Sequence, residues 1–202
     1  LAIVGESGSG KSLSLLAVLG LLPAGAQVSG ERRFNGIALE SLSAGDYRQL
    51  RGAQIGYISQ DPLSNLHPLK SVGKQIEEAI KAHQRLGRRA LRSRVIALLE
   101  EVGIHEAAQR YHHRPALFSG GMRQRVMIAM AIALNPKLII ADEPTTALDV
   151  TVQASILQLL KRLQQQPGCA LLFISHDLRV VADIADRVVV MQHGRVVEQG
   201  ET

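Results

Sequence analysis

Short apolar runs alternate with longer amphipathic segments along this chain. The apolar runs have the length of strands and lie at 1–4, 53–59, 138–141, 170–174 and 187–191. Between them, apolar residues recur at spacings of three and four, which predicts helices over 13–19, 71–86, 88–102, 123–134, 151–163 and 178–184. The stretch 28–36 has the pattern of short strands that turn at Asn35-Gly36. Alternating strands and helices predict an α/β fold with a largely parallel sheet.

Length and composition fit one domain with subdomains. The chain has 202 residues, of which 46% are hydrophobic, and no apolar run approaches the roughly 18 residues of a membrane-spanning helix. Its single cysteine excludes a disulfide framework. The chain opens inside a strand at Leu1 rather than at Met, so we expect it to be a piece of a longer protein that lacks the N-terminal strands.

The net charge of +5 is concentrated in the middle of the chain. The segment 81–125 holds ten lysines and arginines against three glutamates. Two interpretations stay open: a solvated helical face, or a surface that contacts anionic lipid headgroups or nucleic acid. Only 3% of the residues are Phe, Trp or Tyr, which disfavours binding to single-stranded nucleic acid through base stacking.

The segment from Gly5 to Ser12 has the pattern of a phosphate-binding loop. It follows the apolar run 1–4 and precedes the predicted helix 13–19, as such a loop does. Its glycines permit a tight turn that points backbone N–H groups and a helix N-terminus at a polyphosphate. Lys11 is placed to reach the β and γ phosphates, and the Ser12 hydroxyl to hold Mg²⁺. The candidate residues for the phosphates are Gly5, Ser7, Gly8, Gly10, Lys11 and Ser12.

Three further segments carry chemical side chains at the ends of predicted elements. Asp142 and Glu143 follow the strand 138–141, where a parallel sheet presents carboxylates to a ligand; one suits Mg²⁺ and the next suits a general base. His176 follows the strand 170–174 in the same way. Ser119-Gly120-Gly121 precedes a helix and forms a second candidate anion site. The plainer alternatives are N-caps, a surface acidic pair and a structural histidine.

Taken together in chain order, these motifs resemble the nucleotide-binding subunit of ABC transporters over essentially the whole chain. The motifs are the segment 5–12, Gln60, Ser119-Gly120-Gly121, Asp142-Glu143, Ala147-Leu148-Asp149 and His176. Gln60-Asp61-Pro62 with Leu66 and Pro68, and the run 118–125, are most similar to the ATPases of dipeptide, oligopeptide and nickel importers. Phe118 and Met122 replace the usual Leu and Gln, and His67 replaces an Asn, whereas the phosphate-facing Ser119, Gly120 and Gly121 are intact.

The resemblance implies a P-loop NTPase (RecA-like) fold. Its core is a mostly parallel sheet, with an inserted α-helical subdomain and a partial antiparallel β subdomain. We expect a single ABC ATPase domain over 1–202, with the core at 1–66 and 136–202 and the helical subdomain at about 67–135. The aromatic residue that stacks on adenine in this family would lie upstream of Leu1.

The resemblance also implies the roles of individual residues in a head-to-tail dimer that sandwiches two ATP molecules. Catalysis falls to Glu143 as general base, His176 as its bridge to the γ-phosphate, and Gln60, which senses metal and attacking water. Ser12, Gln60 and Asp142 support Mg²⁺. Ser119, Gly120 and Gly121 face the nucleotide of the partner subunit, and Asp149 crosses the dimer interface.

The expected function is ATP binding and hydrolysis that powers import of a small solute, of which a peptide fits the motifs best. The expected partners are a second ABC ATPase subunit or domain, integral membrane permease subunits and an external solute-binding protein. The location would be peripheral, on the cytoplasmic face of the inner membrane.

Two alternatives stay open. The first is an ABC-type ATPase that acts on DNA or ribosomes; fewer than about sixty residues between Gln60 and Ser119, with no heptad pattern, disfavour the DNA-repair form. The second is a non-enzymatic ATP-binding module, which has no need of Glu143 or His176.

Overall fold

The computed structural model describes residues 1–146 and 148–202, which form two compact units. The first unit consists of Leu1–Arg51 and Phe173–Thr202, and the second of Gly52–Leu172. The predicted phosphate loop and His176 belong to the first unit. Gln60, Ser119, Asp142, Glu143 and Asp149 belong to the second.

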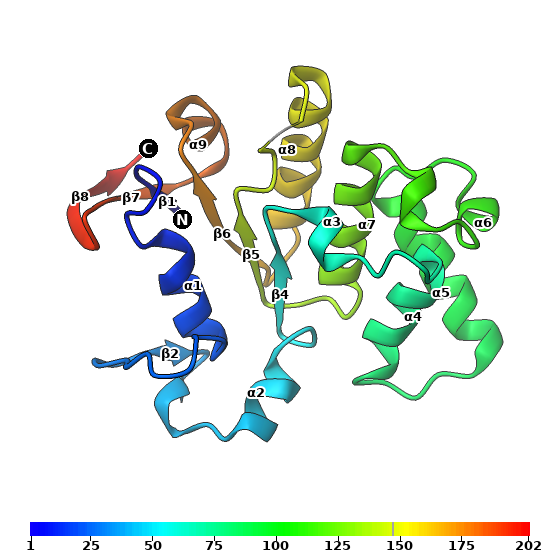
Figure 1. Ribbon diagram of the computed structural model, residues 1–202, viewed down its shortest axis with the longest axis horizontal. Coiled ribbons are helices and arrows are strands. Elements are labelled where there is room, and N and C mark those ends of the chain that lie inside the picture. Colours follow the sequence, from blue (N-terminus) through cyan, green and yellow to red (C-terminus); the bar gives the residue numbers. More distant parts are fainter. Residues whose placement is uncertain (147) are drawn as a thin grey trace. The chain divides into compact units, whose positions relative to one another are not determined.

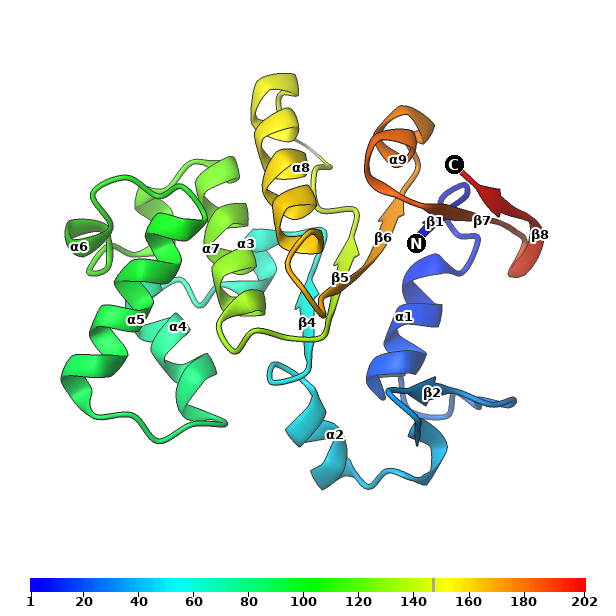
Figure 2. The same cartoon turned by 180° about the vertical axis from the view of Figure 1, so that it is seen from behind.

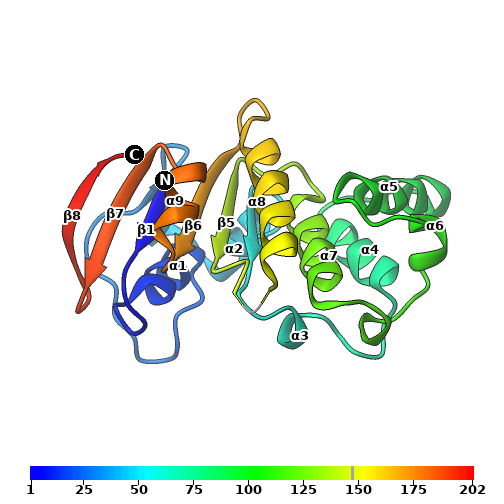
Figure 3. The same cartoon turned by 90° about the horizontal axis from the view of Figure 1, so that it is seen from above.

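A largely parallel sheet organises the first unit (Figure 3). Strand β1 (Ala2–Val4) runs parallel to β7 (Arg187–Gln192) on one side and to the end of β6 (Ala170–Ser175) on the other, with Val4 opposite Ser175. Strand β8 (Arg195–Glu201) pairs antiparallel with β7 at the edge. The predicted parallel pairing is confirmed, and β8 is an element that the sequence pattern did not reveal.

Local turn chemistry determines the remaining elements of this unit. The predicted hairpin turn is confirmed at Asn35-Gly36, where both residues have positive φ, but its strands are shorter than expected and 28–32 is not a strand. A capping box between Ser43 and Asp46 starts a helix that we did not predict. The elements are α1 (Lys11–Leu19), β2 (Arg33–Phe34), β3 (Ile37–Ala38), the short 3₁₀ turn η1 (Leu39–Ser41), α2 (Ala44–Leu50) and α9 (Leu178–Ile184).

The second unit contains a parallel strand pair and most of the helices. The strands are β4 (Ile55–Ile58) and β5 (Leu138–Asp142). Helices α4 to α7 gather at one end of the unit and α7 lies beside α8, as Figures 1 and 2 show from opposite sides. The helical elements are α3 (Pro62–Asn65), α4 (Val72–Lys81), α5 (Arg88–Glu101), α6 (Ala107–Arg110), the 3₁₀ turn η2 (Pro115–Leu117), α7 (Gly120–Ile132) and α8 (Val150–Gln164).

The helix predicted over 71–86 ends at Lys81 instead. Its apolar face buries Val72, Ile76 and Ile80, whereas Leu86 remains 40% exposed. Without a buried side chain, the polar residues after Lys81 gain little from continuing the helix. The helix predicted over 88–102 is confirmed, and Gly103 closes it with a left-handed φ of 79°.

Close contact between β4 and α7 depends on Gly56. A Cβ atom on Gly56 would lie 2.4 Å from the carbonyl oxygen of Ala131 on α7, and a backbone atom cannot move aside as a side chain can. We expect Gly56→Ala to lower the free energy of unfolding by about 1–3 kcal/mol, measured by urea denaturation. Gly200→Ala is the matched control, since Gly200 also lies in a strand, β8, and its Cβ would meet no atom within 4 Å. Equal stability of the two variants would contradict this packing.

Candidate functional site

The phosphate loop wraps its backbone around the Lys11 ammonium group. Lys11 Nζ donates to the carbonyl oxygens of Gly5 at 2.7 Å and Glu6 at 2.8 Å, and the side chain is only 5% exposed. Ser9 is also buried, whereas Ser7, Gly8 and Ser12 are exposed. The chain therefore closes into a ring that presents its outer residues to solvent.

Glycine is required where this ring begins. Gly5 has a φ of 155°, and a Cβ there would lie 2.1 Å from the carbonyl oxygen of Met191. Gly8 and Gly10 also adopt positive φ, and α1 begins after Gly10 without a side-chain cap. Its first N–H groups are therefore not satisfied by a capping side chain, which is the arrangement that binds a phosphate at a helix N-terminus. The loop fits the polyphosphate that the sequence predicts.

Strand register in the second unit brings two of the predicted residues together. Ile58 of β4 lies opposite Ala141 of β5, so the residues that follow each strand meet at the same edge of the pair. There, Gln60 Nε2 donates to Glu143 Oε2 at 3.4 Å across 83 positions of sequence. The grouping of Gln60 with Glu143 follows from parallel pairing rather than from closeness in the chain.

The Glu143 side chain is held by a third residue that sequence reasoning missed. Thr146 Oγ1 donates to Glu143 Oε2 at 2.9 Å, and the Thr146 N–H bonds the Glu143 carbonyl at 3.2 Å in the turn after β5. Glu143 itself has a left-handed φ of 44°, a conformation that non-glycine residues adopt mostly at functional or tightly constrained sites. The sequence signal that could have identified Thr146 is its position three residues after the acid.

Asp142 is the buried acid of the pair. It is 5% exposed at the end of β5 and accepts a hydrogen bond from Tyr57 Oη at 3.4 Å. Burial and the neighbouring Asp142 carboxylate raise the pKa of Tyr57 to about 12, so the phenol stays a neutral donor. Tyr57 is a second residue that the sequence analysis did not assign.

The donor set suits Mg²⁺ held partly by phosphate. Among residues 1–146 and 148–202, the structure contains no group of three or more His, Cys, Asp or Glu side chains that could hold a metal ion. Mg²⁺ commonly binds through one or two carboxylates together with substrate phosphates, rather than in a cage made by the protein alone. A single buried carboxylate at Asp142 fits that mode.

The remaining predicted residues start helices. Ser119 is the N-cap of α7, where its Oγ accepts the Met122 N–H at 3.3 Å. Asp149 is the N-cap of α8, where its Oδ1 accepts the Val152 N–H at 2.9 Å. The capping role weighed for Ser119 is therefore observed. Ala147, part of the third motif, lies outside the described residues.

These two helices begin beside each other because of Gly121. A Cβ atom on Gly121 would lie 2.3 Å from Val152 Cγ1, so only glycine permits the approach. Ser119 and Gly120 are exposed at this end of α7. In the first unit, His176 is exposed in the turn between β6 and α9, next to Asp177, which caps α9. The structure thus gives each predicted residue a position at the end of an element.

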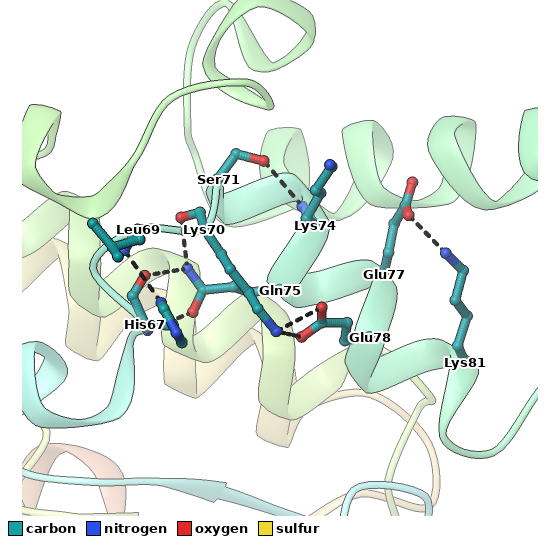
Figure 4. Close-up of polar contacts among 9 residues, drawn as sticks. All are labelled: His67, Leu69, Lys70, Ser71, Lys74, Gln75, Glu77, Glu78 and Lys81. Atoms are coloured by element: carbon teal, nitrogen blue, oxygen red, sulfur yellow. Dashed lines mark hydrogen bonds and ion pairs between the residues drawn. The ribbon is translucent and has the colours of Figure 1, made fainter.

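A buried glutamine fixes the loop that leads from Gln60 to α4 (Figure 4). Gln75 Oε1 accepts the His67 N–H at 2.8 Å, and its Nε2 donates to the carbonyl oxygens of His67 and Lys70 at 3.1 Å each. His67 Nδ1 in turn accepts the Leu69 N–H at 3.2 Å. His67, which replaces the Asn of the importer pattern, is therefore held by Gln75 through its backbone N–H and carbonyl groups.

One protein-family model matches most of this chain. The family model described as ABC transporter matches residues 1–146. The chain belongs to the ABC transporter family. The matched residues include the phosphate loop, Gln60, Ser119, Asp142 and Glu143.

Curated relatives in this family are transport ATP-binding proteins. The chain is 52% identical over 202 residues to the oligopeptide transport ATP-binding protein OppD of Bacillus subtilis, covering 99% of this chain and 56% of that protein. It is 53% identical over 200 residues to the dipeptide transport ATP-binding protein DppD of Escherichia coli, covering 98% of this chain and 61% of that protein. The chain thus spans little more than half the length of these ABC transporter relatives.

Solved ABC cassettes have the same fold. One is a dimeric ATP-binding cassette in a post-hydrolysis state bound to ADP and Pi; it has a TM-score of 0.87 and 31% identity, and the match covers 99% of this chain and 84% of that one. The predicted P-loop NTPase fold, with its mostly parallel sheet, is confirmed. Among the described residues, no helix is both long enough and apolar enough to cross a membrane.

Proposed function

We propose that this chain is the ATP-binding and ATP-hydrolysing part of a subunit that powers peptide import. The observation that carries the ATPase assignment is the contact of Gln60 with Glu143, which joins a polar side chain to the candidate general base. The peptide assignment is supported by relatives at about 50% identity whose names describe oligopeptide and dipeptide transport. The alternative of an ATPase acting on DNA or ribosomes has no such support.

In the proposed reaction, each residue acts at a stated atom. Lys11 Nζ leaves its carbonyl partners to bind the β and γ phosphates, assisted by the N–H groups of Gly5, Ser7, Gly8 and Gly10. Ser12, Gln60 and Asp142 would hold Mg²⁺, which would neutralise charge on the phosphates. Glu143 Oε2 accepts the proton of the attacking water, and Gln60 orients that water. Thr146 holds the Glu143 carboxylate in position.

The other site residues act on the nucleotide or at a subunit interface. His176 contacts the γ-phosphate. Ser119, Gly120 and Gly121 bind the γ-phosphate of a nucleotide held by the partner subunit, and Asp149 contacts that subunit at the interface. Support comes from the exposed start of α7 and from the dimeric state of the solved cassette. The partner is a second ABC ATPase subunit or domain.

The proposed complex also includes two permease subunits and an external solute-binding protein, with this chain on the cytoplasmic face of the membrane. The test is to tag the full-length parent protein in its host, solubilise membranes in mild detergent and identify co-purifying proteins by mass spectrometry. We expect two multi-span permease subunits. Recovery with DNA or ribosomes, and without an integral membrane protein, would overturn the importer assignment.

A further inference from the structure

A pocket of about 410 Å³ lies among helices of the second unit, formed by residues with no role in the proposed ATPase. Three separate stretches build it: one face of α4, the start of α5 with Leu86 before it, and residues 111–112 after α6. The volume is that of a small-molecule site. The lining residues lie between Lys74 and His112, a stretch that includes part of the basic segment 81–125. The proposed ATPase activity does not explain that segment.

The charges around this pocket are unbalanced. Its lining contains four cationic side chains, on Lys74, Lys81, Arg88 and Arg92, against the single carboxylate of Glu77. Lys74, Glu77 and Lys81 follow each other on one face of α4, as Figure 4 shows. Arg88 and Arg92 are four residues apart on α5 and therefore share a face of that helix. A net positive charge is thus focused at one place.

Glu77 is already engaged and offsets only part of that charge. Its carboxylate accepts a hydrogen bond from Tyr111 Oη and lies 2.9 Å from Lys81 Nζ. Burial alone would raise the pKa of Glu77, but the bonds from Tyr111 and Lys81 and the charge of Arg88 outweigh it and lower the pKa. Glu77 therefore stays ionised and positions Lys81 and Tyr111.

The apolar wall of the pocket is preorganised. The Tyr111 side chain is nearly buried, and the Arg92 guanidinium lies 5.3 Å from its ring centroid while Arg92 Nη2 lies 3.1 Å from His112 Nε2. The Tyr111 ring rests against Gly73, where a Cβ atom would lie 2.3 Å from it. Leu91 is also buried here. Tyr111 and Leu91 therefore hold this side of the pocket in place, and Leu86 provides the exposed apolar surface beside the cations.

A solvated helical face does not explain this arrangement fully. It accounts for Lys81, whose ion pair with Glu77 is of the ordinary i,i+4 kind. Within the part of the chain that the structure describes, Lys74 and Arg88 have no ion pair. Neither cation is therefore neutralised by a direct ion pair, although Arg88 lies near enough to Glu77 to lower its pKa. This excess of positive charge beside apolar side chains favours a ligand that has an anionic group and an apolar body.

We propose that this pocket binds the phosphate group of a ligand that also carries an apolar portion. Arginine and lysine side chains recognise phosphate through charge-assisted hydrogen bonds, and the Leu86 side chain, which lines the pocket and is 40% exposed, accommodates the apolar portion. Two sources have this chemistry: a soluble phosphomonoester and the headgroup of an anionic phospholipid.

The test uses the full-length parent protein saturated with a non-hydrolysable ATP analogue, so that the phosphate loop is already filled. Phenyl phosphate binding is measured by titration calorimetry, and vesicle binding by co-sedimentation with phosphatidylglycerol or phosphatidylcholine vesicles. The variant is Arg88→Gln. Its matched control is Arg89→Gln, which makes the same charge change one residue along α5 on a side chain that does not line the pocket.

We expect Arg88→Gln to weaken binding about tenfold or more, and Arg89→Gln to leave it unchanged. If phenyl phosphate shows this pattern, the ligand is a soluble phosphomonoester; if phosphatidylglycerol vesicles show it while phosphatidylcholine vesicles do not bind, the ligand is a lipid headgroup. Equal loss of binding in both variants would mean that binding depends only on overall positive charge, and would overturn the proposal. The proposal is also overturned if the wild-type protein binds neither phenyl phosphate nor the vesicles. ATP hydrolysis by both variants stays at the wild-type rate, so this test is separate from that of the ATPase assignment.

Discussion

Replacing Glu143 by Gln is expected to lower ATP turnover by about 100-fold or more while ATP binding persists. The carboxylate Oε2 that accepts from Gln60 and Thr146 is the proposed proton acceptor, and an amide at that position cannot take the proton. The amide has nearly the same shape, so the loss falls on the chemical step. Steady-state phosphate release measures turnover, and titration with a fluorescent ATP analogue measures binding.

Glu106→Gln provides a closely matched control for that variant. Glu106 also has a left-handed backbone, with a φ of 54° against 44° for Glu143, but it is exposed at the start of α6. Any general cost of placing Gln in this conformation therefore appears in both variants, and only Glu143→Gln should lose turnover. Wild-type turnover in Glu143→Gln would refute its role as general base.

Ser119→Arg is expected to abolish hydrolysis, to below about 1% of the wild-type rate, without weakening ATP binding to the isolated subunit. Ser119 is exposed at the start of α7, and in the proposed dimer it faces the nucleotide of the partner. A long side chain there blocks closure of the dimer, whereas the residues proposed to bind the subunit's own phosphates remain intact. Phosphate release and analogue titration are measured on the same preparation.

The control must separate a blocked interface from a weakened helix. Ser119→Arg also removes an N-cap, which costs about 1 kcal/mol. Ser43→Arg removes the N-cap of α2 in the same way, at another exposed serine, and should retain hydrolysis. Loss of ATP binding by the isolated Ser119→Arg subunit would count against the two-subunit nucleotide site.

Local sequence signals predicted elements well where one residue type enforces one conformation. Asn35-Gly36 predicted a tight turn, and Gly103 predicted the end of α5, because both glycines adopt positive φ that other residues avoid. The end of α4 was predicted wrongly, because it depends on how far the later apolar residues are buried, and Leu86 remains 40% exposed. Strand β8, which is exposed along its length, has no apolar alternation and gains its structure by pairing with β7.

The sequence by itself determined the family, the fold class and the residues that carry the proposed chemistry. A phosphate loop has a fixed spacing because its glycines, Lys11 and Ser12 act through consecutive backbone positions. Tertiary structure alone decided which distant side chains meet: parallel register joins Gln60 to Glu143, and the turn after β5 adds Thr146. It also brought Lys74, Arg88 and Tyr111 around one pocket. Such contacts depend on packing between segments far apart in the chain, which local spacing does not encode.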